Sequence, residues 1–334
     1  NEYGGYLQVA KKLMNDILKL TGSIRYDKNQ NFDGRFTPRI TASIKVAKDN
    51  HFRLSYQTAY RFPSTQDQWI NLNSPSAKLI GALPIFDQVY NFSGNPIYTA
   101  ESVAAFRAKF AATGAIDPTV LVQGKFQSVK PESVKSFEVG YRGVIKEKLM
   151  IDAYVYFSDY SDFLGKVAVA RGANGTQAEL LSPSSSNNFS FVVNSTTPVK
   201  AFGWGLSADY LLPKNFVLNA NISGDELSNV PAGLVTYFNT PKLRYNIGLT
   251  NSNVYQGWGF GILYRWQDKV NWEGTFGSGE IPSYGTWDGM ISYKPDTKTT
   301  IKLGAVNLWN KYYRSAFGNP QVGGVYYISY GYNL

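Results

Sequence analysis

Side chains able to perform acid, base, nucleophilic or metal chemistry are scarce in this sequence of 334 residues. It holds one histidine, His51, and no cysteine. A single imidazole supplies neither a histidine-based triad nor a histidine metal site, and the lack of thiols excludes disulfides and thiolate ligands. His51 also falls at a predicted turn. We therefore expect no catalytic site, no metal site, no cofactor and no enzymatic activity.

Charged side chains recur at alternate positions of several predicted strands. Charges inside a confined interior need partners, so we expect ion pairs there rather than acid–base catalysis. The carboxylates concerned are Glu138, Asp152, Asp209 and Asp288, and the arginines are Arg39, Arg53, Arg142, Arg244 and Arg265. The net charge of +9 comes from scattered Lys and Arg. Because no dense basic run is present, we expect no nucleic-acid partner.

Aromatic side chains gather in the segments that lack strand periodicity. Rings supply stacking area at low entropic cost, as recognition of a sugar or a metal chelate requires. The candidate ligand-binding residues are Trp69, Tyr90, Phe92, Tyr98, Trp272 and Phe276. The alternative is that these rings pack against one another inside a folded loop. The stretch ESVAAFRAKFAA (101–112) predicts a helix that covers a binding site, docks a surface lipoprotein or only packs.

The rest of the chain reads as strands that would position these residues. In GWGFGILYRWQ, large apolar side chains from Trp258 to Trp266 alternate with Gly261, Arg265 and other small or polar residues. A Trp near each end with aliphatic residues between is typical of a strand that crosses a bilayer. The last ten residues, VYYISYGYNL, alternate in the same way. No run of eighteen apolar residues occurs, which excludes a helical membrane protein.

About thirteen such strands are predicted, and their connections alternate in length. Short turns are expected near residues 15–16, 48–50, 146–148, 213–215, 251–256 and 295–298. Longer connections are expected near residues 28–36, 62–132, 160–198, 224–240, 268–282 and 310–324. Short periplasmic turns that alternate with long extracellular loops indicate an all-β, transmembrane antiparallel β-barrel of the bacterial outer membrane. Residues 62–132 would form the longest extracellular loop.

The parity of the strands indicates a part of a larger barrel. With the long loops outside the cell, the first strand of this chain runs inward, as the last one does. An odd number of strands would leave two unpaired edges in lipid, which a bilayer does not tolerate. We therefore expect further strands N-terminal to residue 1 to pair with both edges.

Several motifs resemble those of TonB-dependent outer-membrane receptors. The stretch from YGGYLQVAKKL through LKLTGSIRYD and FTPRI to FRLSYQTAYRFPS resembles the middle of their barrel. VKPESVKSFEVGYRG, YVYFSDYSDFL and GAVNLWNKYY resemble later strands in the same order. The final Leu334 departs from the Phe that usually ends the family.

The resemblance implies a 22-stranded barrel with a plug domain, of which residues 1–334 would be the C-terminal part with about 13 strands. It implies as partners the plug, the N-terminal strands, the TonB complex and outer-membrane lipid. The expected function is active import of a siderophore, cobalamin, an oligosaccharide or a peptide. The alternative is a passive pore or an adhesion barrel that uses the same loops without a plug.

Overall fold

A computed structural model describes residues 1–275 and 277–333. Thirteen long strands form one antiparallel sheet, and each pairs with the next of the thirteen along the chain. The strands, in order across the sheet, are β1 (Glu2–Leu13), β2 (Leu18–Asn29), β3 (Phe32–Ala47), β4 (Asn50–Arg61), β9 (Glu132–Ile145), β10 (Leu149–Ser161), β13 (Val199–Leu211), β14 (Val217–Ser228), β15 (Arg244–Tyr255), β16 (Trp258–Gln267), β19 (Tyr284–Tyr293), β20 (Thr299–Val306) and β21 (Val325–Tyr332). The predicted strand number is confirmed.

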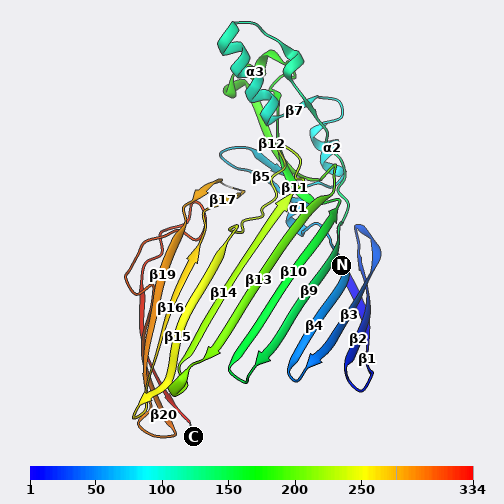
Figure 1. Cartoon of the computed structure of the whole chain (residues 1–334). Helices are drawn as coiled ribbons and strands as arrows, with labels where there is room; N and C mark the ends of the chain where they lie inside the picture. The colour runs from blue at the N-terminus through cyan, green and yellow to red at the C-terminus, as the bar shows by residue number, and fades with distance from the viewer. Residues whose placement is uncertain (276, 334) are drawn as a thin grey trace.

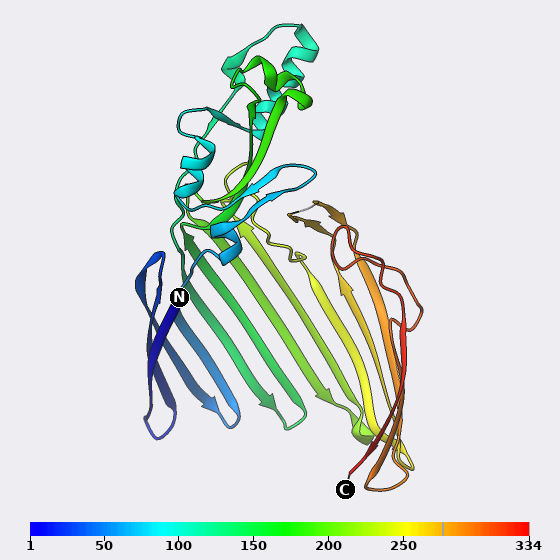
Figure 2. The same cartoon turned by 180° about the vertical axis from the view of Figure 1, so that it is seen from behind.

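The sheet is curved, with β1 and β21 at its two edges (Figures 1 and 2). Over the described residues, β1 pairs with β2 alone and β21 with β20 alone. Each edge therefore presents backbone N–H and C=O groups that lack a strand partner within this chain. None of the helices in the described residues has the length and apolar character of a membrane-spanning helix.

The two faces of the sheet differ as the alternation predicts. On β16, Ile262 lies opposite Leu249 on one side and Gly289 on the other, and 39% of its surface is exposed. The next residue, Gly261, lies opposite Thr250 and Met290 on the other face. Large apolar side chains stay exposed on the first face because no layer of this chain covers it. That face is the one suited to lipid.

Short turns close the hairpins at one end of the sheet (Figure 1). Between β9 and β10 the turn consists of residues 146–148, and the Lys148 N–H donates to Ile145 O at 3.1 Å. Lys146 and Glu147 have φ of 50° and 56°, and two successive positive φ values give a turn the twist of the flanking strands. The expected long connection at 28–36 is wrong. β2 and β3 continue through this range and meet in a turn at residues 30 and 31, where Asn29 Oδ1 accepts a hydrogen bond from the Asn31 N–H.

The two longest connections fold together at the other end of the sheet (Figures 1 and 2). We call residues 62–131 and 162–198 the loop domain. Its six-stranded sheet has the order β5 (Asn71–Asn73), β6 (Lys78–Ile80), β12 (Ser186–Asn194), β11 (Leu164–Gly172), β7 (Ile97–Thr99) and β8 (Gln123–Gly124). Its helical segments are α1 (Thr65–Trp69), α2 (Ile85–Tyr90), α3 (Ala100–Thr113), η1 (Pro118–Val120), η2 (Ala178–Leu181) and η3 (Pro183–Ser185). The remaining elements are η4 (Pro213–Asn215), β17 (Val270–Trp272) and β18 (Gly279–Ile281).

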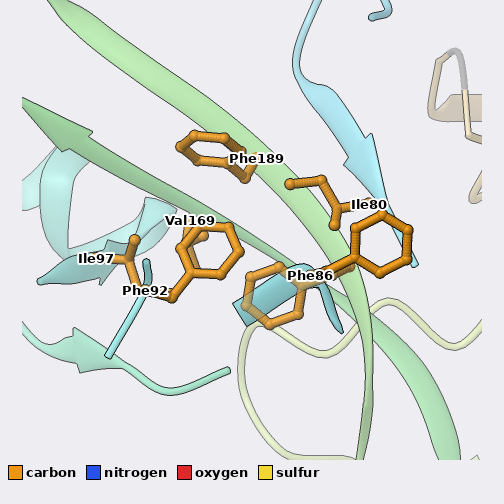
Figure 3. Close-up of a cluster of buried hydrophobic side chains, with 7 residues drawn as sticks. Ile80, Phe86, Phe92, Ile97, Val169 and Phe189 are labelled. Carbon is orange, nitrogen blue, oxygen red and sulfur yellow. The ribbon is translucent and has the colours of Figure 1, made fainter. Parts of the chain in front are cut away.

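The loop domain has its own hydrophobic core. Phe92 is 4% exposed and packs with Phe189 and Phe191, with ring centroids 5.2 and 5.8 Å away. Ile80 and Ile97 complete the same cluster from β6 and β7 (Figure 3). Because these residues come from both connections, neither connection can bury its apolar side chains alone.

The predicted helix at 101–112 is confirmed as α3. The Thr99 hydroxyl accepts a hydrogen bond from the Ser102 N–H at its start, and Gly114 ends it with φ of 70°. Phe106 is fully buried and packs against Ala170 and Leu180. The helix is therefore fastened to the second connection, on the other side of β11 from the phenylalanine cluster.

Candidate ligand-binding surface

Two further connections meet the loop domain at its base. The Lys166 N–H donates to Val235 O at 2.9 Å, and the Val235 N–H donates to Lys166 O at 2.8 Å. Backbones approach closely here, since a Cβ built on Gly165 would lie 2.8 Å from Val235 O and 2.7 Å from the Leu234 side chain. A residue without a side chain is needed for this contact. The segment 229–243 is thus joined to β11.

Glu273, which follows β17 in the chain, also holds the segment 229–243 in place. Its Oε2 accepts hydrogen bonds from the Thr236 N–H at 2.8 Å, the Thr236 hydroxyl at 3.0 Å and the Tyr237 N–H at 2.7 Å. Asn239 Nδ2 donates to Glu273 O at 2.8 Å, and Asn239 Oδ1 accepts from the Glu273 N–H at 2.7 Å. A carboxylate with several N–H and O–H donors holds a loop more firmly than neutral pairs do. The sequence offers no signal for this pairing of two distant loops.

The aromatic candidates occupy different environments. Trp69 is 52% exposed at the end of α1, whereas Phe92 lies in the core of the loop domain. The half-buried Tyr90 donates from its hydroxyl to Asn71 Oδ1 at 2.7 Å.

The other three candidates lie on different segments. Tyr98, on β7, accepts from Gln177 Nε2 at 2.8 Å. Trp272 is half-buried on β17, and Phe276 lies outside the described residues. Of the five described candidates, Trp69 leaves the most ring surface for a ligand.

Ion pairs line the polar face of the sheet. Arg53 contacts Asp152 at 2.7 Å, and Arg142 lies 3.9 Å from the same carboxylate. Arg265 contacts Asp288 at 2.8 Å. Arg142 and Asp152 lie opposite each other on β9 and β10, and Arg265 and Asp288 lie on the paired strands β16 and β19. Arg53, on β4, reaches Asp152 across β9, where it passes over Gly140. The paired side chains are partly exposed, and each pair makes a modest contribution to stability by itself.

Other ion pairs that the sequence predicted on this face differ from those in the structure. Arg244 contacts Asp225, at 3.2 Å, rather than one of the four carboxylates expected from the sequence. Within the described residues, Arg39, Glu138 and Asp209 form no ion pair. The register explains part of this, because Arg39 faces neutral residues of β2 and β4 and Glu138 faces neutral residues of β4 and β10.

The surroundings shift the pKa values of two charged groups in the loop domain. The Arg171 guanidinium lies 5.1 Å from the centre of the Phe189 ring and donates from Nη1 to Tyr90 O at 2.8 Å, and burial lowers its pKa. At the far end of α3, the hydrogen bond from Lys109 lowers the pKa of Asp117 to about 2. Over residues 1–275 and 277–333, no three carboxylate or imidazole groups gather to hold a metal ion.

A large antiparallel sheet with one apolar and one polar face and with short turns at one end is the architecture of an outer-membrane β-barrel protein. Residues 1–308 match the family model described as "TonB dependent receptor-like, beta-barrel". The chain belongs to this family of receptors and transporters, whose members lie in the outer membrane of Gram-negative bacteria and work with a plug domain and TonB. The predicted family, fold class and location are confirmed. No curated protein sequence matches the chain.

Solved structures share the fold at low sequence identity. The siderophore receptor PirA from Acinetobacter baumannii is 14% identical with a TM-score of 0.64, and the match covers 99% of this chain and 45% of PirA. The copper transporter OprC is 15% identical with a TM-score of 0.63, and the match covers 99% of this chain and 48% of OprC. The FrpB iron transporter from Neisseria meningitidis is 14% identical with a TM-score of 0.61, and the match covers 99% of this chain and 44% of the transporter. The chain spans less than half the length of these proteins.

Proposed function

We propose that residues 1–334 form the C-terminal part of a 22-stranded barrel closed by a plug domain. The two free edges of the sheet support this, because unpaired backbone groups in hydrocarbon cost several kcal/mol each. The chain spans less than half the length of the related structures, which also supports this architecture. N-terminal strands of the same receptor would pair with β1 and β21. The apolar face would contact outer-membrane lipid, and the ion-paired face would contact the plug.

The function proposed for the complete receptor is TonB-dependent import of a scarce ligand captured at the loop domain. The observation that carries it is the folding of the two longest connections into one domain with its own core, placed at a single end of the sheet. A rigid domain at the mouth positions a binding surface better than separate mobile loops. The ligand classes stay those of the sequence prediction: a siderophore, cobalamin, an oligosaccharide or a peptide. Helix α3 keeps the three roles expected from the sequence, which are covering the binding site, docking a surface lipoprotein and only packing.

Uptake in cells tests this function. Two matched strains would carry the complete receptor and a version in which residues 64–130 and 163–197 are replaced by short linkers. Candidate ligands would be measured in the presence and absence of TonB. We expect uptake of one class to require both TonB and the loop domain. Uptake that persists without TonB would indicate a passive pore, and cell attachment without uptake would indicate an adhesion barrel.

Refolding tests the proposed architecture separately. Residues 1–334 alone in detergent should give an open or associating sheet, because both edges lack partners. Addition of the N-terminal part of the receptor should convert it to a compact, heat-modifiable species. A closed monomeric barrel of twelve to fourteen strands formed by residues 1–334 alone would contradict the 22-stranded architecture.

A further inference from the structure

Three phenylalanines form a row across the middle strands of the large sheet, on its apolar face. Phe157 on β10 lies opposite Phe137 on β9 and Phe202 on β13. All three side chains are exposed, and the centres of the Phe157 and Phe202 rings are 5.1 Å apart. The row lies toward the end of the sheet that carries the loop domain, since β9 begins at Glu132. Aromatic rows on the outer face of a barrel mark the boundary between hydrocarbon and lipid headgroups.

Charged side chains form the next row toward the loop domain. Asp159 lies opposite Lys135 on one side and Lys200 on the other, and all three side chains are exposed. Each follows or precedes a phenylalanine of the first row by two residues, so the charges share the apolar face and lie about 7 Å farther along the strands. This second row therefore lies at the level of the headgroups.

An arginine adds a third cation at the same end of the sheet. Arg35 Nη1 donates a hydrogen bond to the Ser133 hydroxyl. Ser133 precedes Lys135 by two residues on β9, so the two side chains lie on the same face. Arg35 is half-buried, and the hydrogen bond to Ser133 fixes its guanidinium while other N–H groups stay available to a ligand.

These charges do not neutralise one another. Within the part of the chain that the structure describes, none of the three cations forms an ion pair, and neither does Asp159. Three positive charges and one negative charge give the group a net charge of +2. The residues that flank the charged row on β4 and β14 are a neutral threonine and a neutral serine. Glu226, which lies opposite Phe202, is paired with Lys242 at 3.0 Å.

The two rows together fit one kind of molecule. A lipid with a phosphorylated headgroup places acyl chains along the phenylalanines and phosphate oxygens beside the cations. The Cα atoms of Lys135 and Lys200 are about 10 Å apart, because adjacent strands lie about 4.8 Å apart. Two long side chains at this separation can meet the phosphates of a single headgroup. A free anion would use the cations and leave the phenylalanines without a role.

We propose that the three cations bind the phosphorylated headgroup of a lipid in the outer leaflet, with its acyl chains along the three phenylalanines. The inference goes beyond import, since it gives the outer face of the barrel a specific lipid site, and it rests on the proposed orientation of the sheet in the outer membrane. Strands β9, β10 and β13 lie directly beneath the loop domain (Figure 1). A lipid held there would fasten the barrel wall at the base of that domain.

Native mass spectrometry of the complete receptor in dodecyl maltoside tests the proposal. The probe is lipid A, a disaccharide with two phosphates and several acyl chains, and the matched probe is lipid A without its phosphates. We expect saturable binding of lipid A and no saturable binding of the dephosphorylated lipid. The double variant Lys135→Gln/Lys200→Gln should bind lipid A about thirtyfold more weakly, since each lysine near a charged headgroup contributes about fivefold. Lys135→Arg/Lys200→Arg should keep most of the affinity, and Asp159→Asn should raise it.

A matched control lies on the same hairpin. Lys148 is exposed at the opposite end of β9 and β10, so Lys148→Gln should leave lipid A binding unchanged. Gel mobility with and without heating would show that each variant is folded. Unchanged affinity in the folded double glutamine variant, an equal loss in Lys148→Gln, or equal binding of the dephosphorylated lipid would overturn the proposal. Absence of lipid A binding by the wild type would overturn it too.

Inorganic phosphate distinguishes a lipid from a free anion. A large molar excess of phosphate should leave lipid A bound, because phosphate makes no contact with the phenylalanines. Displacement of lipid A by phosphate would assign the cations to a free anion and overturn the lipid site.

The readout separates this inference from the proposed function. Binding in detergent requires neither TonB nor transport. A receptor that binds lipid A through the two lysines but takes up its ligand without TonB would retain the lipid site and lose the import function. TonB-dependent uptake without lysine-dependent lipid binding would retain the import function and lose the lipid site.

Discussion

Ile262→Arg tests the assignment of the two faces of the sheet. Ile262 lies in the middle of β16, four residues from Trp258 on one side and from Trp266 on the other. Four residues span about 13 Å along a strand, or about 10 Å of membrane depth at a tilt near 45°. Both tryptophans then fall close to the boundaries of the apolar band, and Ile262 falls near its centre. An arginine at that depth costs about 2 to 4 kcal/mol of folding free energy.

Gly261→Ser is the matched control one residue away. A Cβ built on Gly261 would lie 3.4 Å from Thr250 Cγ2 and 4.0 Å from Met290 Cε, which are ordinary contacts. The new hydroxyl would point to the polar face, where asparagine and arginine side chains already lie. We expect a change of less than about 1 kcal/mol, within the range of strand propensities.

Both variants would be compared in the complete receptor reconstituted into phospholipid vesicles. Equilibrium unfolding in denaturant, followed by tryptophan fluorescence, reports the free energy of unfolding, and gel mobility with and without heating reports the folded fraction. We expect a large loss for Ile262→Arg and near-wild-type behaviour for Gly261→Ser. Equal losses, or a larger loss for the glycine substitution, would show that the faces are assigned wrongly.

Three predictions concern the loop domain and its connections. Phe106→Ala should cost about 3 to 5 kcal/mol because it empties a fully buried site, and it should raise proteolysis of the loop domain without changing the heat-modifiable mobility of the barrel. Glu273→Gln removes a carboxylate that accepts three hydrogen bonds, and should speed amide exchange at Thr236 about tenfold; unchanged exchange would contradict a role in fastening this segment. The pKa of Asp117 is lowered to about 2 by the hydrogen bond from Lys109, so its stabilising contribution is present above about pH 4 and is lost as the pH falls toward 2. Amide exchange around the end of α3 between pH 5 and pH 2 should show this loss, and Asp117→Asn should abolish the pH dependence.

The strands were predictable because their signals are local. Side chains that alternate, as Trp258 to Trp266 do with Gly261 and Arg265, assign each residue to a face without any knowledge of its partners. Turn residues such as Lys146 and Glu147 mark where a strand ends. The count of thirteen and the two free edges follow from these local signals alone.

The loop domain was not predictable in the same way. Its sheet pairs Val169 with Thr99 and Phe191 with Ile80, residues that lie far apart in sequence and on short strands without clear alternation. The burial of Phe92 depends on those pairings. The expected connection at 28–36 failed for the opposite reason, since polar residues and a glycine predominate in it and only Phe32 and Phe36 are apolar, so the stretch reads as a loop.

The distribution of buried apolar side chains explains why the two parts of the chain can vary separately. Among the described residues, all buried hydrophobic side chains except those of Val199, Ala201 and Ala305 lie outside the thirteen strands of the large sheet. The large sheet has exposed apolar side chains on one face and polar side chains on the other, so backbone hydrogen bonds between its strands, rather than a buried core, hold it together. The loop domain is stabilised by a water-excluding core, as a soluble domain is. Substitutions in the loop domain are therefore expected to leave the large sheet intact.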